Sequence, residues 1–174
     1  MTQKTFPIHF MITGGTIDSY DRDILYPLVQ HGKSTIPSYI KSLKLDNKTK
    51  FTIICLKDSR DISKKDIQKL LNNINKSTSK HIIVTCGTFA LSDMSRLLEL
   101  NNKKKDKTIV LTGSMIPIYG FPMSDGPFNL GYAVSKVQEL PKGVYVCMNG
   151  NVFSSNEIVK IVTEGKFASI FEEK

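Results

Sequence analysis

The segment Ile12-Thr13-Gly14-Gly15-Thr16 ends the first apolar run of the chain with two glycines and a threonine. Related turns follow two later apolar runs, at Val84-Thr85-Cys86-Gly87-Thr88 and at Leu111-Thr112-Gly113-Ser114-Met115. If the three runs are parallel strands, the turns lie side by side at the carboxyl edge of one sheet, where open α/β sheets bind their ligands. The repetition therefore predicts a crevice on which the hydroxyls of Thr16 and Thr88 converge.

Apolar runs of strand length alternate along the chain with segments of helical spacing. The runs are residues 7–12, 51–56, 81–85, 108–112 and 143–148. The helical stripes are Ile67, Leu70, Leu71 and Ile74 behind a Ser63-to-Asp66 capping signal, then Leu91, Met94 and Leu98, then Leu130, Ala133, Val134 and Val137, with a weaker helix over 37–43. This alternation predicts a three-layer, doubly wound α/β fold whose mainly parallel sheet is covered by helices on both faces.

The length and the end of the chain set further expectations. We expect 174 residues to form one domain over residues 1–174. Ile158, Lys160 and Val162 alternate as in a short strand. Residues 167–171 are expected to pack on the body or on a neighbouring subunit.

Composition excludes several classes of protein. No apolar run approaches the ~20 residues of a membrane span, and the first apolar stretch leads into a glycine turn, as in a strand rather than a signal peptide. The net charge of +8 is carried mostly by lysine, with little arginine and few interleaved aromatics, which favours a solvated surface over nucleic-acid binding. Three cysteines without CxxC spacing indicate reduced, buried thiols, no metal site and a cytoplasmic location.

Common cofactor and nucleophile motifs are absent from the sequence. There is no G-x-G-x-x-G, no phosphate-binding G-x-x-x-x-G-K-[ST] and no G-x-S-x-G elbow. The three histidines, His9, His31 and His81, stand apart in the chain, so a histidine-based triad is poorly supported.

The strand-end turns suit hydroxyl chemistry instead. A threonine hydroxyl needs a base to remove its proton and amide donors to stabilise an oxyanion, and glycine turns expose such amides. Lys107, at the start of the run that ends at Gly113, is a candidate base if burial lowers its pKa. The alternative is that the glycines only form tight turns and that Lys107 is a surface charge.

Six segments, in order, resemble signatures of the bacterial-type L-asparaginase family. They are Thr13-Gly14-Gly15-Thr16-Ile17, Ser59-Arg60-Asp61-Ile62, Thr85-Cys86-Gly87-Thr88, Lys107 to Met115 (like K-P-V-V-x-x-G-A-M), Ser124 to Leu130 (like S-A-D-G-P-x-N-L) and Gly143 to Asn149 (like G-V-x-V-x-M-N). The resemblance covers the amino-terminal domain of that family and implies its fold, without a carboxy-terminal domain.

The resemblance also implies a reaction and roles for individual residues. It implies amide hydrolysis through an acyl-enzyme, with Thr16 as nucleophile and Tyr26 of a lid as its activator; Tyr20 is the alternative tyrosine. Thr88 and Lys107 are expected to form a second hydroxyl–base pair. The substrate-binding positions implied are Gly15, Ser59, Gly87, Phe89 and Ser114, with Ser59 holding the substrate carboxylate, and no cofactor or metal is expected.

The departures from the family pattern concern the recognition of an ammonium group. The aspartate that follows the second threonine in the family is Phe89 here, its histidine before the glycine is Cys86, and its G-A-M-R-P arginine is Ile116. An aromatic ring cannot form the ion pair that a carboxylate forms with the α-ammonium of asparagine. We therefore expect either a substrate without that group or a weakened enzyme.

The expected function is hydrolysis of a small side-chain amide with release of ammonia. The expected partners are an amide or amino-acid-like small molecule and further copies of the chain in a homodimer or homotetramer, with no membrane. The alternatives are a non-catalytic small-ligand binder or partner subunit and, last, a basic nucleic-acid-associated protein.

Overall fold

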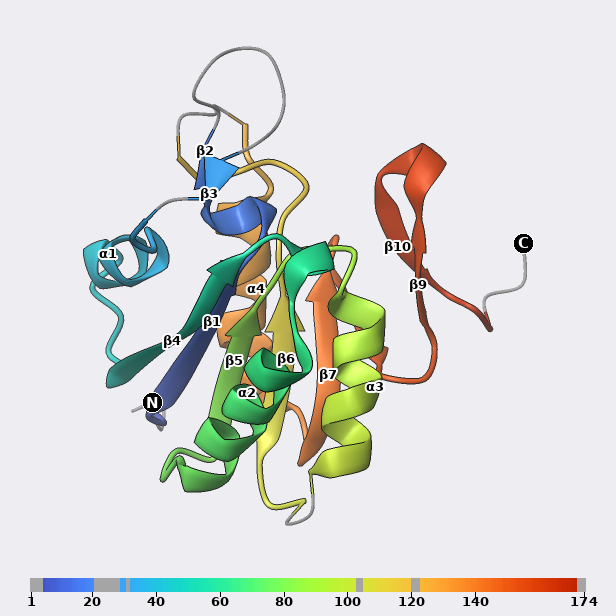
Figure 1. Ribbon diagram of the computed structural model, residues 1–174. Helices are drawn as coiled ribbons and strands as arrows, with labels where there is room; N and C mark the ends of the chain where they lie inside the picture. Colours follow the sequence, from blue (N-terminus) through green and yellow to red (C-terminus); the bar gives the residue numbers. More distant parts are fainter. Residues whose placement is uncertain (1–4, 21–28, 31, 103–104, 120–122, 172–174) are drawn as a thin grey trace.

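The computed structural model describes residues 5–20, 29–30, 32–102, 105–119 and 123–171. Its centre is a six-stranded sheet in the order β4-β1-β5-β6-β7-β8 (Figure 1). The first five strands are parallel and β8 runs antiparallel to β7. The strands are β1 Ile8–Gly14, β4 Thr49–Lys57, β5 His81–Thr85, β6 Thr108–Thr112, β7 Gly143–Met148 and β8 Asn151–Ser154. The predicted α/β class and all five predicted strands are confirmed.

Helices cover both faces of this sheet. The helices are α1 Ile36–Ser42, α2 Lys64–Lys76, α3 Leu91–Asn101 and α4 Gly126–Glu139. In Figure 1, α2 and α3 lie on one side of the sheet and α4 on the other. The central strands are buried on both faces, which is why they read as continuous apolar runs rather than as alternating ones.

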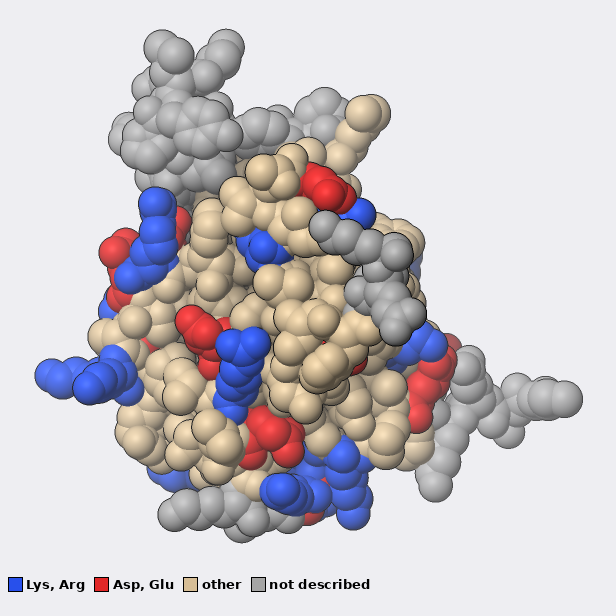
Figure 2. Space-filling model, turned by 90° about the vertical axis from the view of Figure 1, so that its right-hand side faces the viewer, with Lys and Arg blue, Asp and Glu red and all other residues tan. Residues whose placement is uncertain are grey.

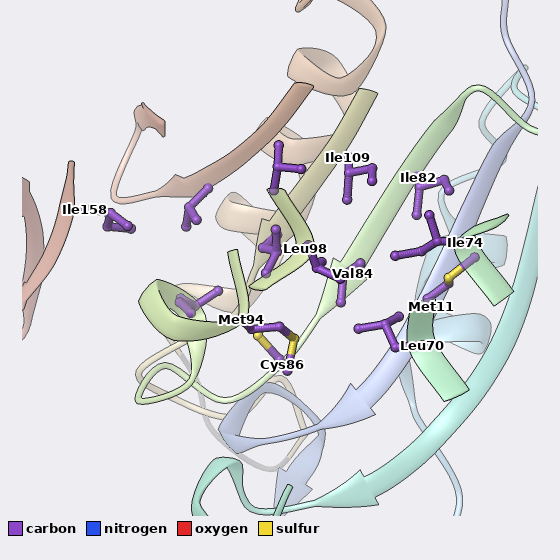
Figure 3. Close-up of a cluster of buried hydrophobic side chains, with 14 of the residues drawn as sticks. Met11, Leu70, Ile74, Ile82, Val84, Cys86, Met94, Leu98, Ile109 and Ile158 are labelled. Carbon is purple, nitrogen blue, oxygen red and sulfur yellow. The ribbon is translucent and has the colours of Figure 1, made fainter. Parts of the chain in front are cut away.

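Two hydrophobic clusters, one on each face, hold the layers together. On β1, Met11 packs with α2 and α3 in one cluster, while Phe10 and Ile12 pack with α1 and α4 in the other. Figure 3 shows the first cluster, in which Leu70 and Ile74 of α2 lie against the strands. Successive strand residues point to opposite faces, so a single strand supplies both cores.

Helix α2 begins where the sequence predicts. The Ser63 hydroxyl accepts a hydrogen bond from the Asp66 N–H, and the Asp66 carboxylate accepts one from the Ser63 N–H, which completes a capping box. Lys57 adds an ion pair to the same carboxylate at 2.6 Å. The cap fixes the start of α2 close to the end of β4.

Two small hairpins stand outside the main sheet. β2 Ser19–Tyr20 pairs with β3 Val29–Gln30, and β9 Ile158–Ile161 pairs with β10 Lys166–Ser169. In Figure 1 the β9–β10 hairpin rises beside α3. Ile158 and Phe167 are buried in the cluster shared with α3, which anchors the hairpin to the body. Figure 3 shows Ile158 in this cluster. Of residues 167–171, which are expected from the sequence to pack on the body or on a neighbouring subunit, Phe167 is buried in the body, whereas Ile170 and Phe171 are exposed.

One sequence expectation about side-chain environment, the burial of all three cysteines, changes in the structure. Cys86 and Cys147 are buried as expected, but Cys55 is only half-buried, and all three thiols are free. His9 is fully enclosed and hydrogen-bonded to the hydroxyls of Ser77 and Thr52. Within the described part of the chain, no helix has the length and apolar character needed to cross a membrane.

Candidate functional site

The three strand-end turns lie next to one another, because β1, β5 and β6 are neighbours in the sheet. The first two turns touch. A Cβ atom built on Gly15 would lie 2.1 Å from the backbone nitrogen of Gly87, and Gly15 has a φ of +85° that other residues rarely adopt. Glycine is required at position 15 both for its backbone conformation and for this close approach. Thr16 and Thr88 each follow directly after one of these two contacting glycines.

Ser59 joins the same edge from the end of β4. It begins the 3-10 helix η2 Ser59–Asp61, and a Cβ atom on Gly87 would lie 2.8 Å from its hydroxyl oxygen. A Cβ atom on Gly113 would lie 2.5 Å from the carbonyl oxygen of Cys86 and 3.7 Å from the Cγ2 of Thr88. The structure thus brings Gly15, Ser59, Gly87 and Thr88 together, and Gly113 adjoins them.

Thr16 occupies the start of a short 3-10 helix, η1 Thr16–Asp18, and is half-buried. The helix is held in place by Asp18, whose carboxylate accepts hydrogen bonds from the Thr35 N–H at 2.8 Å and from the Thr35 hydroxyl at 3.0 Å. Tyr26 lies outside the described residues. Tyr20 belongs to strand β2.

Lys160 of β9 is the base candidate that the sequence did not single out. Its Nζ atom donates a hydrogen bond of 2.8 Å to the Thr88 hydroxyl and lies 3.8 Å from the centroid of the Phe89 ring. Burial lowers the pKa of Lys160 below the ordinary value of 10.5. Among the described residues, no carboxylate forms an ion pair with it. One indication of this role is present in the sequence. Lys160 lies two residues after the apolar Ile158 in a strand-like alternation, so both side chains are expected on the same face of the strand.

The expected pairing of Lys107 with Thr88 is wrong. Lys107 precedes β6, at the amino end of the sheet, whereas Thr88 follows the carboxyl end of β5. At ~3.3 Å per residue the two ends of such a strand are roughly 15–20 Å apart. The Lys107 ammonium is buried and donates instead to the carbonyls of Ser77 at 2.8 Å and Ser79 at 3.4 Å. Neither alternative raised by the sequence holds, because Lys107 is a buried structural cation.

The third turn is clamped by Asp125, which immediately precedes α4. Its carboxylate accepts hydrogen bonds from the N–H groups of Met115, at 2.9 Å, and Ile116, also at 2.9 Å. Asn129 links the same carboxylate, at 3.0 Å, to the Gly113 carbonyl, at 3.1 Å. These bonds explain the aspartate and the asparagine of the S-D-G-P-x-N pattern. Ser114 lies inside the clamped turn with a buried hydroxyl that has no hydrogen-bond partner among the described residues.

The site resembles neither a metal centre nor a thiol site. The described residues contain no group of three or more His, Cys, Asp or Glu side chains that could hold a metal ion. Burial raises the pKa of Cys86, which ends β5, to about 12, so that the thiol stays protonated and is a poor nucleophile. Among the described residues, Thr16, Ser59 and Thr88 supply hydroxyls at this edge, and Lys160 supplies an amine.

Charge is dispersed on the face that includes α3 and the β9–β10 hairpin. Figure 2 shows basic and acidic side chains interspersed with uncharged ones over the described part of this face. Several bases are paired locally, as Arg96 is with Asp93 and Lys166 with Glu164. Such a surface lacks the one-signed stripe that nucleic-acid binding requires.

Comparison with known proteins decides the family. The family model described as "Asparaginase, N-terminal" matches residues 7–171. The chain belongs to the asparaginase family. A glutaminase-asparaginase from Acinetobacter glutaminasificans is 33% identical over 109 residues, which are 59% of this chain and 32% of that protein.

Solved structures support the asparaginase fold. The thermostable L-asparaginase from Thermococcus kodakarensis matches with a TM-score of 0.77 at 24% identity, over 96% of this chain and 52% of that one. A probable cytoplasmic L-asparaginase from Campylobacter jejuni gives 0.76 at 24% identity, over 95% and 53%. This asparaginase-family chain thus spans about half the length of each solved relative and about a third of the curated one.

Proposed function

We propose that the chain is an asparaginase-like amidohydrolase. Its substrate is a small molecule with a side-chain amide and no free α-ammonium group, and the reaction releases ammonia. The observation that carries the proposal is the Thr88–Lys160 hydrogen bond, 2.8 Å long, beside the contacting turns of Gly15 and Gly87. This arrangement places the Thr88 hydroxyl beside an amine with a lowered pKa, next to the turn that precedes Thr16. Membership of the asparaginase family supports the same reaction class.

Thr16 is the proposed nucleophile. Its hydroxyl oxygen attacks the amide carbon, its proton passes to a base, and the amide nitrogen leaves as ammonia with a proton from the site. The acyl group stays on Thr16 as an ester until water hydrolyses it, which restores the hydroxyl and gives the carboxylate product. Tyr26 is the proposed activator of Thr16.

Lys160 is the proposed proton acceptor of the second pair. In its neutral form the Nζ atom accepts a proton from Thr88 or from a water molecule held beside it. Because burial lowers its pKa, the neutral form becomes accessible at lower pH than for an exposed lysine. The face of the Phe89 ring, whose centroid lies 3.8 Å from Nζ, holds the amino group of Lys160 against Thr88.

Backbone amides of the turns are the proposed donors to the oxyanion. The N–H of Gly15 already donates to the Lys57 carbonyl at 2.8 Å, and that of Cys86 to the Thr112 carbonyl at 3.0 Å. These bonds hold the two turns in place, so we assign the donor role to the amides that follow them in each turn.

The substrate class follows from the side chain at position 89. Phe89 provides no negative charge, and the nearby carboxylate of Asp58 is already paired with Arg60 of helix η2 at 2.9 Å. A substrate ammonium placed here would lose an ionic contact worth about 1.5–3 kcal/mol. Ser59 is the proposed contact for the substrate carboxylate.

Ammonia release from a panel of amides tests the proposal. The panel contains asparagine, glutamine, succinamate and N-acetyl-asparagine, and Thr16→Ala is the control. We expect succinamate or N-acetyl-asparagine to be hydrolysed faster than asparagine, and every activity to be lost in Thr16→Ala. Rapid asparagine turnover by the wild type would contradict the substrate class. Ligand binding without turnover, retained in Thr16→Ala, would instead support a non-catalytic binder. Assembly as a homodimer or homotetramer stays a prediction that light scattering can check.

A further inference from the structure

An apolar pocket lies between η2 and α3, beside the contact of Ser59 with Gly87. Its volume is about 320 Å³, near the small end of the range of ligand sites. Six of the residues that line it are hydrophobic: Ile62, Ile67, Phe89, Ala90, Met94 and Leu97. Phe89 is 61% exposed and Leu97 is 41% exposed, so apolar surface faces solvent at this point of the molecule.

The pocket shares two walls with the candidate active site. Ser59 lines it and also touches the position of a Cβ atom on Gly87. Phe89 lines it and also carries Lys160 on its ring at 3.8 Å. A ligand whose amide lies between Thr16 and Thr88 therefore has the pocket as the continuation of its own site, on the side of residue 89.

The two arginines near the pocket are each paired with an aspartate. Arg60 forms an ion pair with Asp58 at 2.9 Å, and Arg96 approaches the carboxylate of Asp93 at 3.8 Å. Asp93 is the one carboxylate among the residues that line the pocket. Because the carboxylates of both pairs are already engaged and the Lys160 ammonium is nearby, a cationic ligand group is disfavoured at this pocket. An apolar group, which gains free energy when it is buried, is favoured.

We propose that this pocket is a subsite for an apolar substituent of the amide substrate, attached near the carbon at which asparagine bears its ammonium group. The inference rests on the proposed function and specifies its substrate class. The ligand is an amide with a carboxylate for Ser59 and an acyl or aryl group of modest size for the pocket.

The test compares a small and a bulky substituent on the same amide. The probes are N-acetyl-asparagine and N-phenylacetyl-asparagine, and ammonia release gives kcat/KM for each. For the wild type we expect a kcat/KM about tenfold higher for the phenylacetyl compound, the size of effect that a small apolar group brings to a fitted pocket. Equal or lower values for the phenylacetyl compound would overturn the inference.

Leu97→Trp fills the pocket, and Leu100→Trp is its matched control. Leu100 lies on the same helix, is 81% exposed and does not line the pocket. We expect Leu97→Trp to abolish the preference for the phenylacetyl compound and to leave kcat/KM for N-acetyl-asparagine nearly unchanged. Leu100→Trp should keep the wild-type preference. An equal loss for both probes in a variant that melts like the wild type would contradict a subsite.

Binding separates failure of the inference from failure of the proposed function. Calorimetry measures the affinity of the wild type and of Leu97→Trp for N-phenylacetyl-aspartate, the product of the bulky probe. If no amide is hydrolysed but this compound binds and Leu97→Trp abolishes its binding, the subsite stands and the proposed function fails. Unchanged binding in Leu97→Trp overturns the subsite.

Two further outcomes would assign the pocket differently. If Asp93→Asn lowers turnover of asparagine, the pocket recognises an ammonium group and the inference is wrong. If Leu97→Trp changes the sedimentation of the protein and not its binding of the probe, a second copy of the chain covers the pocket, and the inference is wrong as well.

Discussion

Lys160 donates a hydrogen bond of 2.8 Å to the hydroxyl of Thr88 from a hairpin 72 residues further along the chain. The hairpin is tied to the body by Ile158, whose side chain is buried and whose carbonyl accepts a hydrogen bond from the Ser92 hydroxyl at 3.3 Å. These contacts hold the lysine at the carboxyl edge of the sheet, where the three glycine turns meet.

Replacing Lys160 by methionine should reduce kcat for the best amide about 100-fold or more, because a positioned general base contributes roughly 10²–10⁴-fold. Stability should change little, since the side chain is only half-buried. The matched control is Lys107→Met, which leaves the carbonyls of Ser77 and Ser79 without their donor and should cost about 1–3 kcal/mol of stability. Activity per folded molecule should survive in Lys107→Met. The reverse pattern, with activity lost only in Lys107→Met, would contradict the assignment.

Phe89→Asp should raise kcat/KM for asparagine, because it introduces a carboxylate for the α-ammonium group. In this variant, the increase of kcat with pH should also occur at a higher pH than in the wild type. Burial lowers the pKa of Lys160 in the wild type, and a nearby carboxylate favours the charged ammonium and so raises that pKa. Full pH profiles of kcat check both effects. Phe89→Leu, which removes the ring without adding charge, should not increase asparagine turnover; an increase there would show that charge is not the reason.

Gly15→Ala should destabilise the protein and disrupt the crevice. The φ of +85° costs an alanine about 1–3 kcal/mol, and the added Cβ atom would lie 2.1 Å from the Gly87 nitrogen, so backbone must move. We expect a lower melting temperature and loss of ammonia release at temperatures where the variant is still folded. Gly165→Ala is a control for strain alone, because Gly165 also has a positive φ, of +62°, but no atom within 4 Å of an added Cβ. Equal activity losses in the two variants would argue against the contact with Gly87.

His9 should make the protein less stable in mild acid. Burial first, and then the charges of Lys50 and Lys107, lower its pKa from 6.5 to about 4. Because the folded state favours neutral His9, its contribution is complete above pH 6.5 and is lost as the pH falls from 6.5 towards 4. The loss amounts to roughly 3 kcal/mol. Urea unfolding between pH 7.5 and 4 measures the loss. His9→Gln should reduce the slope of the free energy of unfolding against pH. An unaltered slope would assign the pH dependence to another group, such as His81, whose pKa is also lowered by burial.

The sequence determined the architecture because its information is local and repeated. Continuous apolar strands, amphipathic stripes and the capping box at Ser63 each reflect the period of one element and its burial. The strand-end turns were recognisable for the same reason, since glycine and threonine occupy fixed places after each strand. Strand adjacency then brought Gly15, Gly87 and Gly113 together, as expected for β1, β5 and β6 of one sheet.

The partner of Thr88 was decided by the tertiary structure alone. The lysine that begins a strand and the lysine that lies within a hairpin strand look alike in sequence, but they lie at opposite edges of the folded sheet. A parallel sheet separates the two ends of each strand, so Lys107 is held among carbonyls at the amino edge. Packing of Ile158 and Phe167 against the core returns the β9–β10 hairpin to the carboxyl edge, where Lys160 meets Thr88 and Phe89. Such a contact depends on long-range packing, and no periodicity in the sequence encodes it.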